Sequence, residues 1–471
     1  MLFRPELIIS ELYQLLLIGA LFIQIVAKRS WMPRVEQWLP WGAGVGIFLS
    51  IPSMESSGIM FNGAYCVDHL SQFFKLTLSL GFAVAVLNAI RQPTLKREKR
   101  CEYFMFMAIS VWGLMILSSA VELITIYLAL EIASFSLFPL VPLRSDDKMA
   151  AEAAVKYIFF GVAATAIGLF GFSFILASQH TGYLIDLAHK SWSWSAAPMA
   201  VAGMTLFLCG MLFKLALFPF HFWAPDVYQG AGNETAAYIS TMPKVGAVVV
   251  LIRLTDLFRP GLEITTILAV LSALSMTYGN LAALVQTDVK RLLGYSTIAH
   301  AGYVMVGLVA GTQEGLAGAA FYAFVYVLMN FTCFWVLCRV ASDGRNLELN
   351  DLNGLSRRAP GLALILTVGA VALVGLPPTA GFMGKFFLLT AAWNRGYNWL
   401  VVIAAANVAV SLYYYLNLIR HAYGEDEPRR APAEMTGPVF NLLWGALLAA
   451  LLILLGIVPG PLFSLAAGPS A

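Results

Sequence analysis

The chain places ionisable side chains inside segments that are otherwise apolar. Between Ala200 and Trp223 there is no acidic residue, and only Lys214 and His221 are basic. A charge at the bilayer centre costs about 2.5–3.5 kcal/mol on insertion scales. The pattern recurs in four further apolar segments, at Glu131, Lys156, Lys244 and Lys385. Titratable groups expected to be buried on five helices indicate a path for protons or other ions.

The chemistry of such a path depends on the balance between burial and charge pairing. Burial disfavours the charged ammonium, and a nearby carboxylate favours it. A lysine between these influences can load a proton and release it as the carboxylate approaches or leaves. His300 and His221 are candidate shuttles, because imidazole titrates near neutral pH. Both could instead be structural core residues, and Lys156, near the start of its helix, could be structural or interfacial.

The bulk composition predicts the elements that carry these residues. The chain has 471 residues, of which 59% are hydrophobic and 12% charged, whereas soluble domains average about 25% charged residues. We therefore expect an all-α polytopic membrane protein. A spanning helix needs about 20 mostly apolar residues. The candidate segments, fourteen in all, are centred near residues 17, 45, 80, 110, 132, 164, 211, 247, 274, 301, 329, 376, 409 and 449.

The distribution of basic residues predicts the orientation. Most of the 29 Lys and Arg, including the cluster Lys96–Arg100, fall in the odd-numbered connections between helices. By the positive-inside rule these connections face the cytoplasm. With fourteen helices, both termini then lie on the outer, periplasmic side of a prokaryotic inner membrane. We expect contact with the lipid bilayer and none with nucleic acid.

Proline and glycine predict two broken helices. Pro219 follows Lys214 in helix 7, and Pro377-Pro378 precedes Lys385 in helix 12. Interrupted helices at corresponding positions of two halves indicate a transport path. Five helices separate them, so we expect two inverted five-helix repeats, helices 4–8 and 9–13. The single membrane domain then divides into residues 1–100 (helices 1–3), 101–258 (first repeat), 259–421 (second repeat) and 422–471 (helix 14).

No pattern for a cofactor is visible. The five cysteines form no CxxC pair, so neither a metal site nor a disulfide framework is expected. There is no glycine-rich phosphate loop and no dinucleotide-binding fingerprint. We expect no cofactor in this chain, and any redox chemistry linked to it must occur in partner subunits.

Four segments carry a family resemblance. Phe213 to Ala231, Leu128 to Leu143, Gly294 to Gly307 and Gly375 to Phe386 resemble helices 7, 5, 10 and 12 of the antiporter-like membrane subunits of respiratory complex I, which are related to Mrp cation/proton antiporters. The sequence of the helix 7 segment looks like that of subunit N rather than of subunits L or M, and Lys385 in helix 12 fits subunit N or L. One departure is Gly232 to Ala237, where the family usually has a proline-rich run and this chain has Glu234.

The resemblance implies a proton-translocating role in an NADH:quinone oxidoreductase. Glu131 would partner Lys214, Lys244 would be the central relay, and Lys385 the terminal lysine of the second half. Flavin, iron–sulfur clusters and quinone would belong to partner subunits. The expected neighbours are a subunit M-like chain and the small membrane subunits on the quinone side. Two alternatives stay open, a subunit of a Mrp-type antiporter and a membrane scaffold with a vestigial channel.

Overall fold

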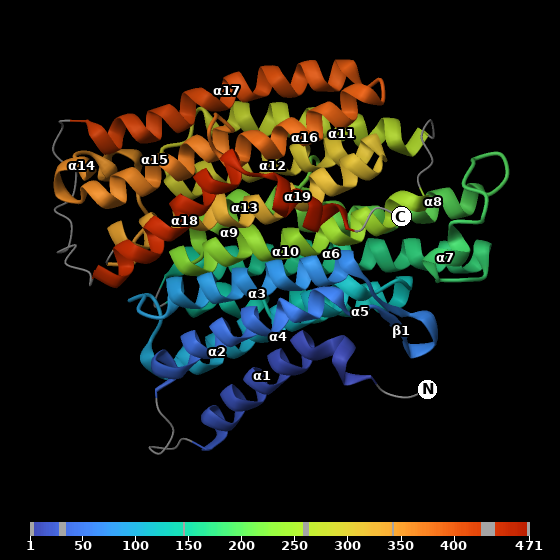
Figure 1. The fold of residues 1–471 in the computed structure, drawn as a ribbon, viewed down its shortest axis with the longest axis horizontal. Helices are drawn as coiled ribbons and strands as arrows, with labels where there is room; N and C mark the ends of the chain where they lie inside the picture. Colours follow the sequence, from blue (N-terminus) through green and yellow to red (C-terminus); the bar gives the residue numbers. More distant parts are fainter. Residues whose placement is uncertain are drawn as a thin grey trace.

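The computed structural model describes residues 4–27, 34–144, 147–257, 263–341, 343–424 and 439–468. It is a bundle of helices that run roughly parallel to its long axis, with α1 at one edge and α17 at the opposite edge (Figure 1). The helices are α1 Ile9–Ala27, α2 Val35–Ser50, α3 His69–Ala89, α4 Arg100–Ser119, α5 Leu123–Phe135, α6 Lys148–Gln179, α7 Leu184–Leu187, α8 Pro198–Leu215, α9 Trp223–Gly230, α10 Asn233–Leu254, α11 Glu263–Ala283, α12 Val289–Ala310, α13 Gln313–Val340, α14 Leu355–Arg358, α15 Pro360–Val374, α16 Ala380–Asn394, α17 Asn398–Tyr423, α18 Val439–Ile457 and α19 Gly460–Ala467.

The expected membrane protein is confirmed by the length and composition of these helices. Among the described residues, eleven helices are long and apolar enough to cross a membrane, and a pair bent by 82° near the C-terminus brings the number up to twelve. Of the two remaining predicted centres, residue 45 lies in α2 and residue 376 at the break between α15 and α16. Fourteen crossings and the two inverted repeats remain predictions. The boundary expected at residues 258 and 259 lies outside the described residues.

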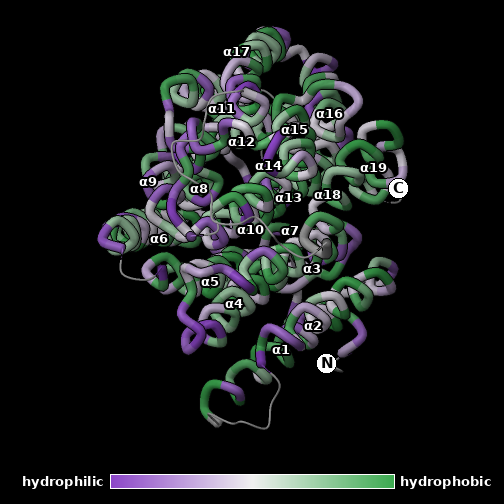
Figure 2. Tube along the Cα trace, turned by 90° about the vertical axis from the view of Figure 1, so that its left-hand side faces the viewer, coloured by the Kyte–Doolittle hydropathy of each residue, from purple (hydrophilic) through white to green (hydrophobic). Residues whose placement is uncertain are grey.

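The centre of the bundle is formed by α10, α12 and α13. Every residue in the most apolar stretch of α10 is buried, and nearly all are buried in α12 and α13. A helix that is apolar all round belongs in the interior. By contrast, α1, α6 and α17 each bury about a third or less of their own most apolar stretch. They lie at the outside of the bundle, as the view along the helices shows (Figure 2). The central helices carry most of the expected site.

Local signals explain where several helices begin. Asp68 caps α3 in a capping box with Ser71, and Asp288 accepts a hydrogen bond from the backbone of Arg291 at the start of α12. Such side chains satisfy backbone N–H groups that have no partner within the helix. The only strands in the described part of the chain, β1 Gly58–Met60 and β2 Tyr65–Val67, form a short antiparallel hairpin between α2 and α3.

The two expected helix breaks are confirmed. Between α8 and α9 the Phe218 amide donates to Ser275 Oγ at 2.8 Å, and Trp223 Nε1 donates to the Phe213 carbonyl at 3.0 Å. Between α15 and α16, Gly375 adopts a positive φ of 83°. Inside a membrane such breaks need protein or water to satisfy the freed backbone groups, and here side chains do so. Pro243, directly before Lys244, lies inside the continuous helix α10.

Candidate functional site

Lys244 lies on the fully buried helix α10. Its side chain is enclosed by aromatic rings: Nζ donates to Tyr228 Oη at 2.8 Å and lies 5.3 Å from the centre of the Trp223 ring. Both rings belong to α9, the second half of the broken helix. Rings facing an ammonium stabilise its charge through their quadrupole. The break in the helix therefore supplies the immediate surroundings of the central lysine.

A small cavity joins Lys244 to the second half of the molecule. It has a volume of about 20 Å³, and its polar lining comes from Lys244, Thr297, His300 and Tyr326. A space of this size holds about one water molecule when polar partners are present. The Tyr326 hydroxyl also makes a 2.8 Å hydrogen bond with Thr297 Oγ1. The lysine and the histidine thus line one shared cavity in the centre of the bundle, together with apolar side chains such as that of Leu215.

His300 continues this row of polar groups toward the other side. Its Nδ1 forms a 2.6 Å hydrogen bond with Tyr322 Oη, and its Nε2 lies 3.3 Å from Tyr415 Oη. Tyr415 in turn is hydrogen-bonded to Ser296. All of these side chains are buried. A histidine with a hydroxyl group on each ring nitrogen can take up a proton on one side and release one on the other.

Lys385 occupies the second helix break. Its Nζ donates to the carbonyl groups of Leu373 at 3.1 Å and Val374 at 2.8 Å, the last residues of α15. It also lies 4.3 Å from the centre of the Tyr303 ring. The C-terminus of a helix carries partial negative charge and unpaired carbonyls. The break therefore provides a buried ammonium with partners other than a carboxylate.

Lys214, in the first half of the molecule, differs from Lys244 and Lys385 in its hydrogen bonding. Lys214 is buried, and its Nζ has no hydrogen-bond partner among the described residues. Glu131, its expected partner, is partly buried and accepts a hydrogen bond from Thr165 Oγ1 at 2.8 Å. Among the described ion pairs within 4.0 Å, none joins Glu131 to Lys214, although their charges interact over the longer distance. This arrangement leaves both groups free to change partners.

Two further expected residues lie apart from the central row. The side chain of Lys156 is 38% exposed and pairs with Glu152 and Asp226, each at 2.8 Å, so the expectation that it is buried is wrong. The helix α6 that carries it lies at the outside of the bundle. His221 is buried, its ring stacks on Phe218, and neither ring nitrogen has a hydrogen-bond partner among the described residues.

Sequence reasoning missed a second group of buried polar residues. Lys290 lies between two of the predicted helix centres, where a connection is expected, yet it is 1% exposed and its Nζ donates to the Ala231 carbonyl at 2.6 Å. Glu234 is 2% exposed and accepts a hydrogen bond from Thr94 at 2.6 Å. Both lie at the starts of central helices, α12 and α10. A charged residue in the first turn normally signals a helix end at the surface, so sequence position alone concealed their burial.

Within the described residues there is no cluster of three or more His, Cys, Asp or Glu side chains that could hold a metal ion. The polar groups of the central row are instead hydroxyl groups, imidazole and ammonium. Each of these groups can bind or release a proton. They lie between α10 and α16 in the middle of the bundle.

Comparisons with known proteins place this arrangement in a family. The model of the NADH:quinone oxidoreductase/Mrp antiporter transmembrane region matches residues 120–411. A protein named NADH-quinone oxidoreductase subunit N 2 from Solidesulfovibrio magneticus is 55% identical, covering 98% of this chain and 97% of that protein. Another of that name, from Opitutus terrae, is 42% identical over 97% of this chain and 95% of its own length.

Comparison with solved structures supports the same family. A chain of respiratory complex I from Thermus thermophilus is 31% identical, with a TM-score of 0.85, 98% of this chain covered and 100% of that chain. A chain of the Mrp complex from Dietzia shares the fold at 18% identity, with a TM-score of 0.86 and coverage of 99% and 97%. The expected family resemblance is confirmed: the chain belongs to the NADH:quinone oxidoreductase/Mrp antiporter transmembrane family.

Proposed function

We propose that this chain is the subunit N-like, proton-translocating membrane subunit of a complex I-type NADH:quinone oxidoreductase. Quinone reduction would occur in partner subunits, which would hold flavin and iron–sulfur clusters, and this chain would carry protons. The relatives named subunit N favour this branch of the family over the Mrp antiporters. The observation that carries the proposal is the row of buried proton-exchanging groups from Lys244 through His300 to the helix break at Lys385.

The proposed path has two halves. In the first, Lys214 exchanges its proton under the influence of Glu131, and Lys244 receives it. In the second, the proton passes from the cavity beside Lys244 to His300 and on to Lys385. Each pK unit of coupling between charges corresponds to about 1.4 kcal/mol, so a small displacement of Glu131 changes the proton occupancy of Lys214 strongly. His221 and Lys156 would act at the entrances to this path.

The family and the distribution of basic residues support a placement of the chain in its assembly. The chain would lie in a prokaryotic inner membrane with both termini on the outer side. Its neighbours would be a subunit M-like chain and the small membrane subunits on the quinone side. Helices 4–8 and 9–13 would form inverted repeats, so that the breaks beside Lys214 and Lys385 are equivalent.

Purification of the native assembly separates this function from its runner-up. We expect iron–sulfur subunits to co-purify and the assembly to reduce quinone with proton uptake into vesicles. Sodium/proton exchange in proteoliposomes without any redox substrate, and no co-purifying redox subunits, would instead identify a Mrp-type antiporter.

A further inference from the structure

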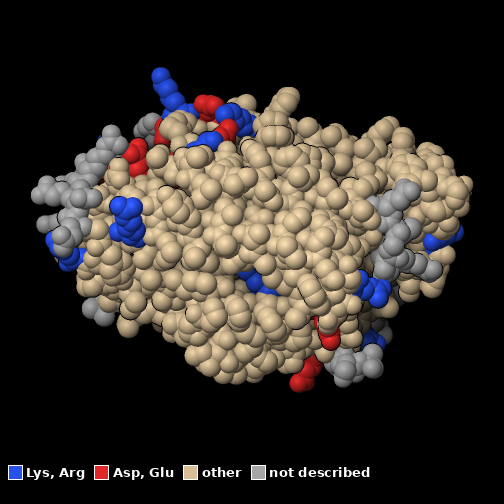
Figure 3. All heavy atoms as spheres, turned by 90° about the horizontal axis from the view of Figure 1, so that it is seen from above, with Lys and Arg blue, Asp and Glu red and all other residues tan. Residues whose placement is uncertain are grey.

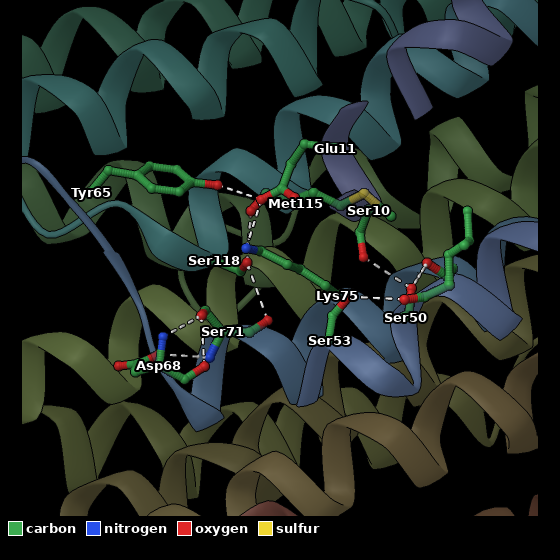
Figure 4. A network of polar contacts seen from close by, with 12 residues as sticks. Ser10, Glu11, Ser50, Ser53, Tyr65, Asp68, Ser71, Lys75, Met115 and Ser118 are labelled. Atoms are coloured by element: carbon green, nitrogen blue, oxygen red, sulfur yellow. Dashed lines mark hydrogen bonds and ion pairs between the residues drawn. The ribbon is translucent and has the colours of Figure 1, made fainter. Parts of the chain in front are cut away.

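A buried ion pair lies in the first three long helices, outside the residues matched by the family model. Lys75 on α3 is fully buried, Glu11 on α1 is 5% exposed, and Lys75 Nζ lies 2.6 Å from Glu11 Oε1 (Figure 4). The ring of Tyr65 lies beside the ammonium, at 5.5 Å, and its hydroxyl donates to Glu11. Neither the sequence nor the family comparison assigns these residues a role.

Stability alone explains this pair poorly. Removing two charges from water costs several kcal/mol per ion, and replacing a buried pair by apolar residues of similar volume is often neutral or stabilising. The helix α1 is already held by uncharged polar contacts. Ser10 is hydrogen-bonded to Ser50 at 3.2 Å, and Gln14 donates to the Ala108 carbonyl at 3.2 Å. The Glu11–Lys75 ion pair is therefore not needed to hold α1 against its neighbours, because uncharged polar contacts already do so.

The pair is also incompletely satisfied. The second carboxylate oxygen of Glu11 has no hydrogen-bond partner among the described residues, and neither does the nearby Ser119 hydroxyl. One oxygen of this buried carboxylate is left without a partner in the described part of the chain, and protonation would remove the charge of the carboxylate from an apolar interior. Transfer of a proton from Lys75 Nζ to that carboxylate converts two charges into a neutral amine and a neutral acid.

Polar groups connect this pair to the end of the molecule where α3 begins. Ser71 and Ser118 lie between Lys75 and Asp68 (Figure 4), and the side chain of Asp68 is 36% exposed. Burial acts to raise the pKa of Asp68, but the Arg253 guanidinium beside it outweighs burial and lowers the pKa below its usual value. Asp68 therefore remains negative at neutral pH, paired with Arg253 at this end of the molecule.

The same groups link the pair to the central helix. Arg253, in the last turn of α10, donates to both carboxylate oxygens of Asp68 at 2.9 and 3.0 Å. Its Nε also donates to the Ser118 carbonyl at 2.9 Å. The helix that carries Lys244 is thus fixed directly to the polar groups beside Lys75. We propose that Glu11 and Lys75 form an additional proton-binding pair, which exchanges its proton with the end of the molecule where Ser118, Ser71 and Asp68 lie.

This inference rests on the proposed function, and its test uses the whole assembly. The double variant Glu11→Leu/Lys75→Met removes both charges and leaves the contacts of Ser10 and Gln14 in place. We expect the assembled complex to retain quinone reduction and to lose proton pumping relative to electron transfer. Unchanged pumping per electron in an assembled double variant would overturn the inference.

Matched variants complete the experiment. Glu36→Gln/Arg100→Gln removes an ion pair between α2 and α4 and should leave proton pumping unchanged. If this variant loses as much pumping as Glu11→Leu/Lys75→Met, the loss reflects a general structural effect of removing an ion pair, which contradicts the inference. Lys214→Ala distinguishes the two proposals, because normal pumping in that variant contradicts the proposed function itself. Infrared difference spectra supply a direct readout. A carboxylic acid band that changes during turnover and disappears in Glu11→Gln supports the pair, and its presence in that variant contradicts it.

Discussion

At the scale of single residues, the buried lysines on α3, α8, α10 and α16 have different sets of partners. Lys244 has a tyrosine hydroxyl and two rings, Lys385 has backbone carbonyls, Lys75 has a carboxylate, and Lys214 has no hydrogen-bond partner among the described residues. An ammonium without a carboxylate is held less firmly in its charged form. The lysines can therefore differ in how readily they release a proton, which a relay requires.

The hydroxyl group of Tyr228 provides a test at this scale. In Tyr228→Phe the buried Lys244 ammonium loses its 2.8 Å hydrogen bond, and an unsatisfied buried polar group costs about 1–3 kcal/mol. We expect assembly to persist and the proton-to-electron ratio of the complex to fall. Tyr238→Phe is the matched control, because Tyr238 lies on α10 but donates to the Met107 carbonyl. Equal ratios in both variants would show that this hydroxyl group does not serve the path.

Burial of individual residues was only partly predictable. Lys214, Lys244, Lys385 and His300 are all buried, as expected from the long apolar segments around them. Lys156 stands in a similar segment but faces outward, because the side of a helix that meets the bundle depends on packing rather than on composition. The direct pairing expected for Glu131 and Lys214 is not present within 4.0 Å, since the alignment of side chains across helices is a tertiary property.

At the scale of elements, the two helix breaks position the charged groups. Pro219 and the Pro377-Pro378 pair allowed both breaks to be predicted, because proline cannot donate the hydrogen bond that continues a helix. Pro243 carries the same local signal, yet α10 continues through it. The helices packed on every side of α10 maintain its course, and a sequence does not reveal that support.

Glycine 375 tests the importance of the second break. At its positive φ a side chain is strained, and a Cβ atom would lie 2.9 Å from Lys385 Cδ. Strained backbone conformations cost about 1–3 kcal/mol. We expect Gly375→Ala to lower the free energy of unfolding by roughly this amount. We also expect it to reduce proton pumping, because the added Cβ displaces Lys385. Gly44→Ala is the control, because nothing lies within 4 Å of its added Cβ; similar losses in both variants would refute a specific role for the break.

At the scale of the whole molecule, one face carries few charges in its middle. Figure 3 shows this face as mostly uncharged, with a small basic group near its centre and the other visible Lys, Arg, Asp and Glu near its rim. Composition and hydropathy were sufficient to predict this arrangement. The buried charges on α1 and α3 were not foreseen as a pair, because 64 residues separate Glu11 from Lys75 and only the packed bundle brings them together.

The orientation in the membrane can be tested at the same scale. Lys190 and Arg97 are both exposed, and the positive-inside rule predicts that they lie on opposite sides. In intact cells a membrane-impermeant maleimide should label Lys190→Cys and not Arg97→Cys, with both labelled after the cells are opened. Labelling of Arg97→Cys alone in intact cells would reverse the proposed orientation.

The central claim is that buried charged groups in this chain carry protons across the membrane. Its most direct test is the number of protons pumped per electron by the assembled complex in liposomes, compared between wild type and Lys214→Ala, Glu131→Ala and Lys385→Ala. The account predicts intact assemblies that still transfer electrons to quinone and pump markedly fewer protons. The wild-type ratio in all three assembled variants would contradict it.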